Sequence, residues 1–237
     1  MISTAAGWTI QEDLLVEGRL RSLGLRHAFT TRRSGDMKEP ANRKAAAARL
    51  GLPEPATLTQ VHGTTIHVAS KDARAREGDG WIVDSPGIVV GVYVADCVPL
   101  YVWSEDATVA GVFHAGWRGL AAGMAKAAVE ALRRHSGATA ARLSAAIGPH
   151  IGACCYKVGP ELEKSFPASS FVRGEDGLRL DLAAETRRQL LEAGLSPERL
   201  GAPAPCTASD PDCYFSFRRD KRDARMLALL SLEPWPS

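Results

Sequence analysis

Short apolar runs separated by polar turns fill the middle of the chain and predict a series of β-strands. The two central runs, 88–95 and 98–103, are apolar at nearly every position. A strand with one face in water alternates apolar and polar residues, so a continuously apolar strand is covered on both faces. We therefore predict a layered core, with strands near 57–61, 64–69, 88–95, 98–103, 108–113 and 143–147.

Signals for helix ends lie outside these runs. Asp181 is a candidate N-cap of a segment that stops at Gly194, and Gly137 follows an amphipathic run with a basic last turn. Pro160 stands at a position favoured in the first turn of a helix. Helices are thus expected at 41–51, 117–136, 159–166 and 181–194. The mixture predicts an α+β or α/β protein, and element order alone leaves both classes open.

Composition and charge narrow the class of protein. With 237 residues, 45% hydrophobic and 24% charged, the chain is expected to fold as one large globular domain, 1–237. Its net charge of +2 and dispersed basic residues argue against nucleic acid as a partner. The apolar stretch 87–103 contains Asp96 and Pro99, which favours a core strand over a membrane span. Five cysteines without an export signal predict free thiols and a cytoplasmic location.

Three potential metal ligands stand in similar places. His62, Cys97 and His114 each fall where an apolar run meets a turn, often beside glycine or alanine. Two imidazoles and one thiolate supply three ligands and leave a fourth position open, which is typical of a catalytic zinc site. Their intervals match no local zinc motif, and buried His and Cys residues are often structural. From spacing alone, both interpretations stay open.

Six ordered blocks of sequence resemble the bacterial YfiH family. This family was long described as a multicopper polyphenol oxidase or laccase-domain family and is now described as zinc-dependent purine nucleoside phosphorylases. The resemblance runs from about His27 to Arg225. The blocks are "TQVHG", "GDGWIVDSPG", "VADCVPL", "FHAGWRGL", "IGPHIGACCYKVG" and "FSFRRD".

The resemblance implies a fold, a metal site and an activity. The implied fold is a β-sandwich core of mixed sheets flanked by helices, shared with a bacterial toxin domain that acts as a cysteine hydrolase. The implied ligands of the catalytic metal are His62, Cys97 and His114. The implied reaction is phosphorolysis of adenosine, inosine and methylthioadenosine, accompanied by adenosine deamination, with zinc as the cofactor and a nucleoside and phosphate as partners.

Further residues would serve this chemistry. Asp79 and Asp96 are candidates for orienting a ligand or carrying protons, although each can also simply cap a turn. Trp117 could stack on a purine or anchor its helix, and Arg118 with the helix start could bind an anion. Arg32 and the pair Arg218 and Arg219 could add donors, although 218–225 can equally be a solvated, self-paired face.

The chain departs from the family pattern at three points. Thr59 stands where the family usually has Asn, and Val94 stands where it usually has Thr. A segment with a "SLNLG"-like stretch, common in the family after the block that holds Arg32, is absent. If that segment lines the pocket, substrate choice and phosphorolysis itself depend on what replaces it.

Three other functions use the same residues. A four-copper oxidase is excluded because the six histidines include no His-x-His pair, but one copper ion could bind the three ligands. A metal-free hydrolase would use Cys97 as nucleophile and His114 as base. The family has also been linked to peptidoglycan quality control, which would make the protein a binding or editing factor.

Overall fold

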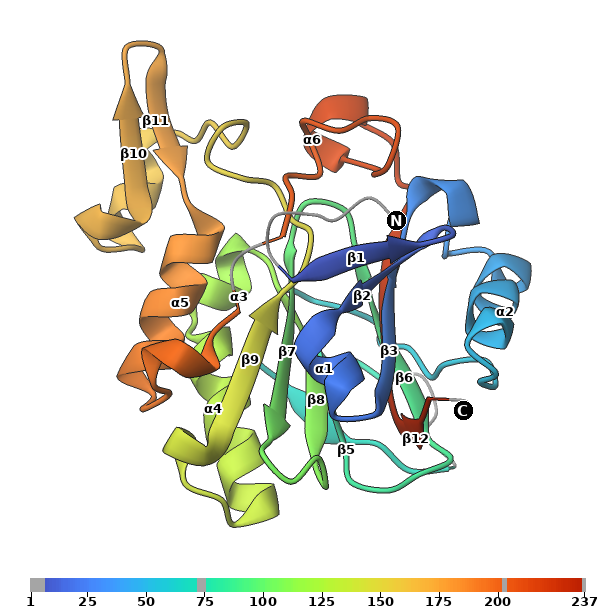
Figure 1. Cartoon of the computed structure of the whole chain (residues 1–237). Coiled ribbons are helices and arrows are strands. Elements are labelled where there is room, and N and C mark those ends of the chain that lie inside the picture. Colours follow the sequence, from blue (N-terminus) through green and yellow to red (C-terminus); the bar gives the residue numbers. More distant parts are fainter. Residues whose placement is uncertain (1–6, 72–75, 202–203, 236–237) are drawn as a thin grey trace.

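The fold is built on two five-stranded sheets that pack face to face, with helices outside them (Figure 1). The computed structural model describes residues 7–71, 76–201 and 204–235. The first sheet has the order β1-β2-β3-β12-β6 and is antiparallel throughout. The second has the order β4-β5-β8-β7-β9, in which β4 and β5 run parallel. The expected sandwich of mixed sheets flanked by helices is confirmed.

The strands of the first sheet are β1 (Trp8–Gln11), β2 (Leu14–Glu17), β3 (Leu25–Thr30), β6 (Val89–Val94) and β12 (Met226–Pro234). Those of the second are β4 (Ile66–Val68), β5 (Gly80–Val83), β7 (Val98–Ser104), β8 (Ala110–Ala115) and β9 (Leu143–Ile147). A separate hairpin joins β10 (Phe171–Gly174) to β11 (Gly177–Leu180) and projects from the body (Figure 1). The helices are α1 (Gly18–Ser22), α2 (Pro40–Arg49), α3 (Trp117–Ala121), α4 (Met124–Ser136), α5 (Leu182–Glu192) and α6 (Phe217–Asp220).

Strand β7 shows why the central runs are apolar throughout. Tyr101 and Trp103 pack between the two sheets, whereas Leu100 and Val102 pack on the opposite face, in the cluster that includes α4. Successive side chains of a strand point to opposite faces, so a strand covered on both sides needs apolar residues at every position. The predicted double covering is confirmed.

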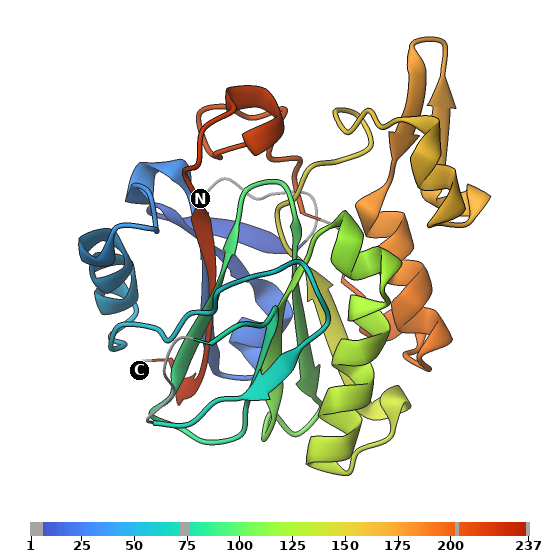
Figure 2. The same ribbon diagram turned by 180° about the vertical axis from the view of Figure 1, so that it is seen from behind.

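Helices cover both outer faces of the sandwich (Figure 2). Helices α4 and α5 cover the second sheet, and α2 packs on the first through Ala46 and Ala47. Asp181 caps α5 as expected, accepting a hydrogen bond of 2.8 Å from the N–H of Ala184. Gly137 ends α4 with a φ of 71°.

Several expected elements take another form. The single helix predicted at 117–136 is wrong, because Gly123 adopts a φ of 87° and separates α3 from α4. Residues Pro160–Lys164 form a 3-10 helix, and 57–61 contain one isolated bridge, at Thr59, instead of a strand. Strands β1, β2, β3, β5 and β12 and the β10–β11 hairpin were not anticipated. Four of them, β1, β2, β3 and β12, lie near the termini. The runs of β1, β2 and β3 are short or interrupted by polar residues, whereas the apolar run 226–230 of β12 was overlooked.

His27, on β3, is fully buried and is expected to make folding sensitive to acid. Its Nε2 accepts from the Glu17 N–H at 2.8 Å, and its Nδ1 lies 2.8 Å from the Leu25 carbonyl, an arrangement that suits the neutral ring. Burial lowers the pKa of His27 to about 4, so between about pH 6.5 and 4 the unfolded chain binds the additional proton. Stability should therefore fall by roughly 3 kcal/mol as the pH drops through this window.

Urea unfolding at neutral pH and near pH 4.5 measures this loss. The variant His27→Gln keeps a donor and an acceptor but does not titrate, so its stability should change less over the same interval. His67→Gln is the matched control, because His67 is partly exposed on β4. An equal loss in wild type and His27→Gln would show that other groups cause the acid sensitivity.

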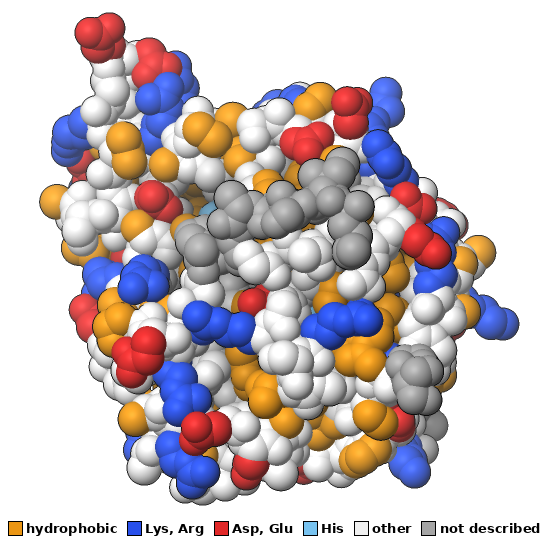
Figure 3. All heavy atoms as spheres, viewed as in Figure 1, with side chains coloured by type: hydrophobic (Ala, Val, Ile, Leu, Met, Phe, Trp, Pro, Cys, Tyr) orange, Lys and Arg blue, Asp and Glu red, His pale blue; other side chains and the backbone are white. Residues whose placement is uncertain are grey.

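Acidic and basic side chains are interspersed on the face shown in Figure 3. Such mixing fits the small net charge of +2. Among the described residues, no helix combines the length and the apolar character needed to cross a membrane.

Candidate metal centre

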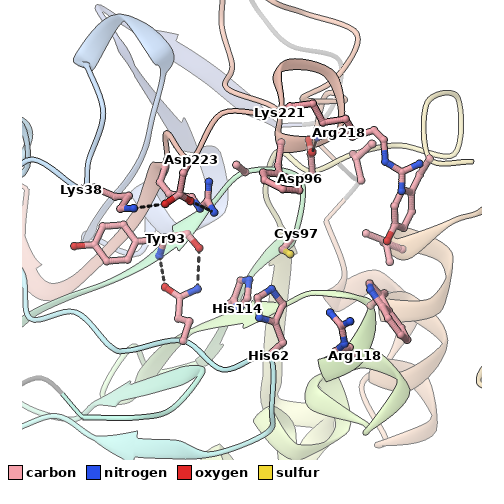
Figure 4. Close-up of a pocket in the computed structure, with 18 of the residues that line it drawn as sticks. Lys38, His62, Tyr93, Asp96, Cys97, His114, Arg118, Arg218, Lys221 and Asp223 are labelled. Carbon is pink, nitrogen blue, oxygen red and sulfur yellow. Dashed lines mark hydrogen bonds and ion pairs between the residues drawn. The ribbon is translucent and has the colours of Figure 1, made fainter. Parts of the chain in front are cut away.

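His62, Cys97 and His114 come together at one end of the sandwich, where β7 begins and β8 ends (Figure 4). Cys97 lies in the turn by which the chain leaves β6 in the first sheet and enters β7 in the second. His114 stands near the end of β8, paired with Pro99 of β7, and His62 lies in the loop before β4. Ligand atoms of the three side chains all lie within 4.8 Å of one another. Residues distant in sequence thus form one donor cluster, as the sequence analysis required.

The backbone at this cluster adopts unusual conformations. His62 has a φ of 61° and Asp96 a φ of 86°, in the left-handed region that residues other than glycine rarely occupy. Such conformations cost free energy and persist where the surrounding structure holds them, often at functional sites. Here they turn the chain sharply beside His62 and Cys97.

Asp79 connects the two histidines. Its buried carboxylate accepts a hydrogen bond from Nδ1 of His114 at 2.8 Å and from the backbone N–H groups of His62 and Gly63 at 2.9 and 2.7 Å. Burial by itself raises the pKa of Asp79, but these hydrogen bonds outweigh it and hold the pKa below its usual value. A proton on Nδ1 of His114 leaves Nε2 available as a ligand, which is how carboxylates orient metal-binding histidines. Asp79 is therefore a positioning residue.

The donor set suits a soft or borderline metal ion. Burial alone raises the pKa of the Cys97 thiol, but His114 and His62 together lower it to about 6, so the thiolate dominates at neutral pH. Burial alone lowers the pKa of His114, but the Cys97 thiolate and Asp79 raise it to about 9. The thiolate thus favours a second proton on His114. A bound divalent cation can take the place of this proton and balance the charge of the thiolate. Two imidazoles and a thiolate match the ligands preferred by zinc and copper.

Gly116 leaves the space that the cluster needs. A Cβ atom at this position would stand 2.8 Å from Sγ of Cys97 and 2.9 Å from Cδ2 of His62. We expect Gly116→Ala to displace both ligands and to weaken metal binding by at least about 10-fold, as misplaced ligands do. Zinc competition against a chromophoric chelator measures this. Gly201→Ala is the control, since its φ is not positive and a Cβ there would meet no atom closer than 3.7 Å. Unchanged affinity in Gly116→Ala would contradict the proposed ligand set.

A cavity of about 1040 Å³ opens over the three ligands. It lies between this end of the sandwich and the segment that contains α6 (Figure 4). Besides the donor cluster, its lining combines aromatic rings with basic groups. The aromatic residues are Tyr93, Trp117, Tyr156 and Phe217, and the basic residues are Lys38, Arg118, Arg218, Lys221 and Arg225.

Three of the predicted substrate residues line this cavity. They are Trp117, Arg118 and Arg218. The guanidinium of Arg118 lies 4.5 Å from the centroid of the Trp117 ring, and that of Arg218 lies 4.8 Å from the Tyr156 ring. Among the described residues, neither arginine forms an ion pair with a carboxylate. One guanidinium nitrogen of Arg218, Nη1, donates to the carbonyl of Lys157 at 2.5 Å. The absence of a carboxylate partner leaves the charge of both arginines available to an anion.

The structure places Arg32 and Arg219 outside the lining of the cavity. Arg32 donates to the carbonyl of Pro211 at 2.9 Å. Arg219 pairs with Asp220 and donates to the carbonyls of Thr207, Ala208 and Tyr214. These bonds fix the loop before α6, so a direct role of either arginine in substrate binding stays a prediction that its placement does not favour.

Asp96 lies beside Cys97, but its carboxylate is already engaged. It accepts hydrogen bonds from Thr207 Oγ1 at 2.7 Å, from Ser216 Oγ at 3.0 Å and from the Arg218 N–H at 2.7 Å. These contacts tie the turn at Cys97 to the segment that contains α6. The contacts of Asp96 are those of a positioning residue. A role of Asp96 in proton transfer stays a prediction.

Several lining residues were not singled out from the sequence. Tyr156 lies in a quoted block but received no role, and Phe217 is half-exposed beside the predicted Arg218. Lys38 comes from the short segment after Arg32 and pairs with Asp223 across the cavity rim (Figure 4). This short segment therefore still contributes a charged group to the cavity. No local sequence signal marks Lys38, because its place depends on contacts with the opposite end of the chain.

Comparisons with known proteins agree with this arrangement. The family model described as "Multi-copper polyphenol oxidoreductase laccase" matches residues 30–233. The chain is 35% identical over 202 residues to a purine nucleoside phosphorylase of Xylella fastidiosa, covering 79% of this chain and 76% of that protein. It is 33% identical over 162 residues to adenosine deaminase RL5 from an unknown prokaryotic organism, covering 65% of this chain and 62% of that protein.

A solved structure has the same fold. The Bacillus licheniformis hypothetical protein YfiH matches with a TM-score of 0.84 and 26% identity, over 94% of this chain and 98% of that one. The family model covers far more than half of the chain, and the fold agrees along almost the whole length. The chain belongs to the multi-copper polyphenol oxidoreductase laccase family, the same family as the YfiH family that its sequence blocks resemble.

Proposed function

We propose that the protein is a zinc-dependent purine nucleoside phosphorylase that also deaminates adenosine, with residues 1–237 acting as one catalytic domain. The observation that supports this most directly is the His62, Cys97 and His114 cluster in the floor of a cavity lined by aromatic and basic side chains. Relatives named for both activities strengthen the proposal.

His62, Cys97 and His114 would hold the zinc ion, and Asp79 would keep His114 in the tautomer that binds it. When bound, zinc acts as a Lewis acid and activates water near neutral pH. The donor set also suits copper, so the metal is a question for experiment. The chain contributes a thiolate that neutralises part of the ion's charge.

The cavity walls suit the two halves of the substrate pair. Trp117, Tyr156 and Phe217 offer flat apolar faces on which a purine base can stack. Arg118 and Arg218 offer guanidinium groups that bind phosphate oxygens through paired hydrogen bonds. In phosphorolysis a phosphate oxygen forms a bond to the ribose C1′ while the bond from C1′ to the base breaks. Cationic side chains beside the donor cluster would hold the phosphate in position for that attack.

Chromatography of adenosine incubated with zinc-loaded protein tests the proposal. Adenine that forms only with phosphate supports the phosphorylase and shows that the absent "SLNLG"-like segment is dispensable. Inosine that forms with or without phosphate supports the deaminase. If neither product forms with zinc or with copper loaded, the proposed function is wrong for this chain.

One other function has a specific observation in its favour. Cys97, His114 and Asp79 form a thiolate, imidazole and carboxylate series like that of cysteine hydrolases, and the pKa of Cys97 is lowered as such a nucleophile requires. Metal analysis separates the two functions. A metal-free protein that is active and is trapped by iodoacetamide at Cys97 would be a hydrolase.

A further inference from the structure

A second cluster of cysteines lies away from the His62, Cys97 and His114 centre. Cys154 and Cys155 lie in the loop after β9, and Cys206 comes from the segment after α5. Their three sulfur atoms all lie within 4.8 Å of one another. Within the described residues, this group and the centre above are the two sets of three or more His, Cys, Asp or Glu side chains with that spacing. The adjacent pair Cys154 and Cys155 did not by itself indicate a metal site in the sequence. The fold brings the third sulfur, that of Cys206, next to this pair.

The spacing of the sulfurs matches a shared metal ion. Sγ of Cys154 and Sγ of Cys155 are 3.6 Å apart. Two thiolates that each lie about 2.3 Å from one ion stand roughly 3.8–4.0 Å apart, in tetrahedral or trigonal geometry. A disulfide would need the sulfurs at about 2.05 Å, and bonding between neighbouring residues is strained. The observed separation therefore suits coordination better than oxidation.

The surrounding backbone leaves room for an ion and orients one sulfur. The Gly152 N–H donates to Sγ of Cys206 at 3.2 Å. A Cβ at Gly152 would stand 3.3 Å from the sulfur of Cys154 and 3.7 Å from that of Cys206, so the glycine keeps this side of the cluster less crowded. Cys154 is exposed, whereas Cys155 and Cys206 are half-buried. An ion can thus reach the cluster from solvent.

We propose that Cys154, Cys155 and Cys206 form a second metal site, a three-thiolate site for Cu(I). Soft thiolate ligands select soft cations, and Cu(I) is stable with three sulfur ligands. Structural zinc sites take four protein ligands, and the cluster holds three within the described chain. Binding replaces the thiol protons by the cation and involves no change of oxidation state.

Such an ion would join two segments that reach the main cavity. The Cys154 and Cys155 loop lies between Ile151 and Tyr156, which both line that cavity. Cys206 precedes Thr207, which donates to the carboxylate of Asp96. Cu(I) at the three sulfurs would therefore brace the cavity wall, at a place separate from the proposed catalytic ligands.

Anaerobic competition for Cu(I) against bathocuproine disulfonate tests the site. The reduced full-length Cys97→Ala variant, which lacks the thiolate of the first centre, should still withdraw one equivalent of Cu(I). Adding Cys206→Ala or Cys154→Ala should lower the Cu(I) affinity by at least about 100-fold. Replacing a residue that only orients a metal ligand lowers metal affinity by about 10–100-fold, and the loss of a ligand itself should have a larger effect. Cys213→Ala is the matched control, because Cys213 is a half-buried free cysteine outside the cluster and its removal should change nothing.

X-ray absorption at the copper edge provides a second readout that does not depend on activity. Three sulfur neighbours in the Cu(I)-loaded Cys97→Ala variant would support the site. Failure of this variant to take Cu(I) from the chelator, retention of the equivalent in Cys154→Ala, or a two-sulfur shell would overturn it. Cys154 is exposed, so its replacement leaves core packing intact and circular dichroism can verify the fold. None of these outcomes depends on whether the protein turns over nucleosides.

Discussion

Replacing Cys97 with alanine is expected to abolish retention of the catalytic metal and to lower nucleoside turnover by more than about 100-fold. Replacing a residue that merely orients a metal ligand lowers metal affinity or activity by about 10–100-fold. Cys97 is proposed as a ligand itself, so its loss should have a larger effect. The two imidazoles that remain carry no negative charge to offset a divalent ion. Zinc content after gel filtration and turnover of adenosine measure the two effects.

Cys213→Ala controls for the loss of a cysteine as such, because that thiol lies outside the cavity lining. It should retain the metal and the activity of the wild type. If Cys97→Ala kept its zinc, the thiolate would not be a ligand. If the wild type held no zinc yet was active, and Cys97→Ala was inactive, the cysteine hydrolase would replace the phosphorylase.

Asp79→Asn is expected to lower zinc affinity by about 10–100-fold. The substitution removes the negative charge that faces Nδ1 of His114 and replaces one carboxylate oxygen by an amide donor. The N–H groups of His62 and Gly63 donate to different oxygens of Asp79, and the amide keeps only one oxygen, so it can accept from only one of them. Competition with a chelator measures affinity, and turnover is then compared at limiting and at saturating zinc.

A positioning role predicts that saturating zinc restores much of the activity of Asp79→Asn, whereas it should not rescue Cys97→Ala. Asp84→Asn is the matched control, since Asp84 also contacts a histidine, His135, at 2.7 Å, but both side chains are partly exposed. It should bind zinc normally. Wild-type affinity in Asp79→Asn would show that His114 needs no carboxylate for metal binding.

Local patterns predicted the central part of the fold well. The continuous apolar runs became β6 and β7, and the caps at Asp181 and Gly137 stand where the helix signals placed them. These features depend on neighbouring residues, because caps and apolar periodicity are set within a few positions along the chain. The break at Gly123 was missed because a glycine within a helical pattern does not by itself reveal a left-handed φ.

Pairing between distant segments could not be predicted in the same way. Strand β12 joins β3 near the start of the chain, with Leu229 opposite Ala28. The short strands β1 and β2 and the longer β3 and β12, near the two ends of the chain, are stabilised by such pairing and by burial in the sandwich, which are non-local contacts. For the same reason, the sequence did not indicate that Arg32 and Arg219 are occupied by backbone carbonyls.

The sequence indicated which donor residues form the candidate centre. It did not show that these residues come together in space. His62, Cys97 and His114 already stood at the ends of apolar runs, and the resemblance to a known family grouped them. The tertiary structure decided that their ligand atoms converge, that Asp79 orients two of them and that Gly116 leaves them space. It also decided that Cys206 meets Cys154 and Cys155. A sequence records which chemical groups are present, but only packing of the two sheets and their loops sets the distances at which such groups can share one ion.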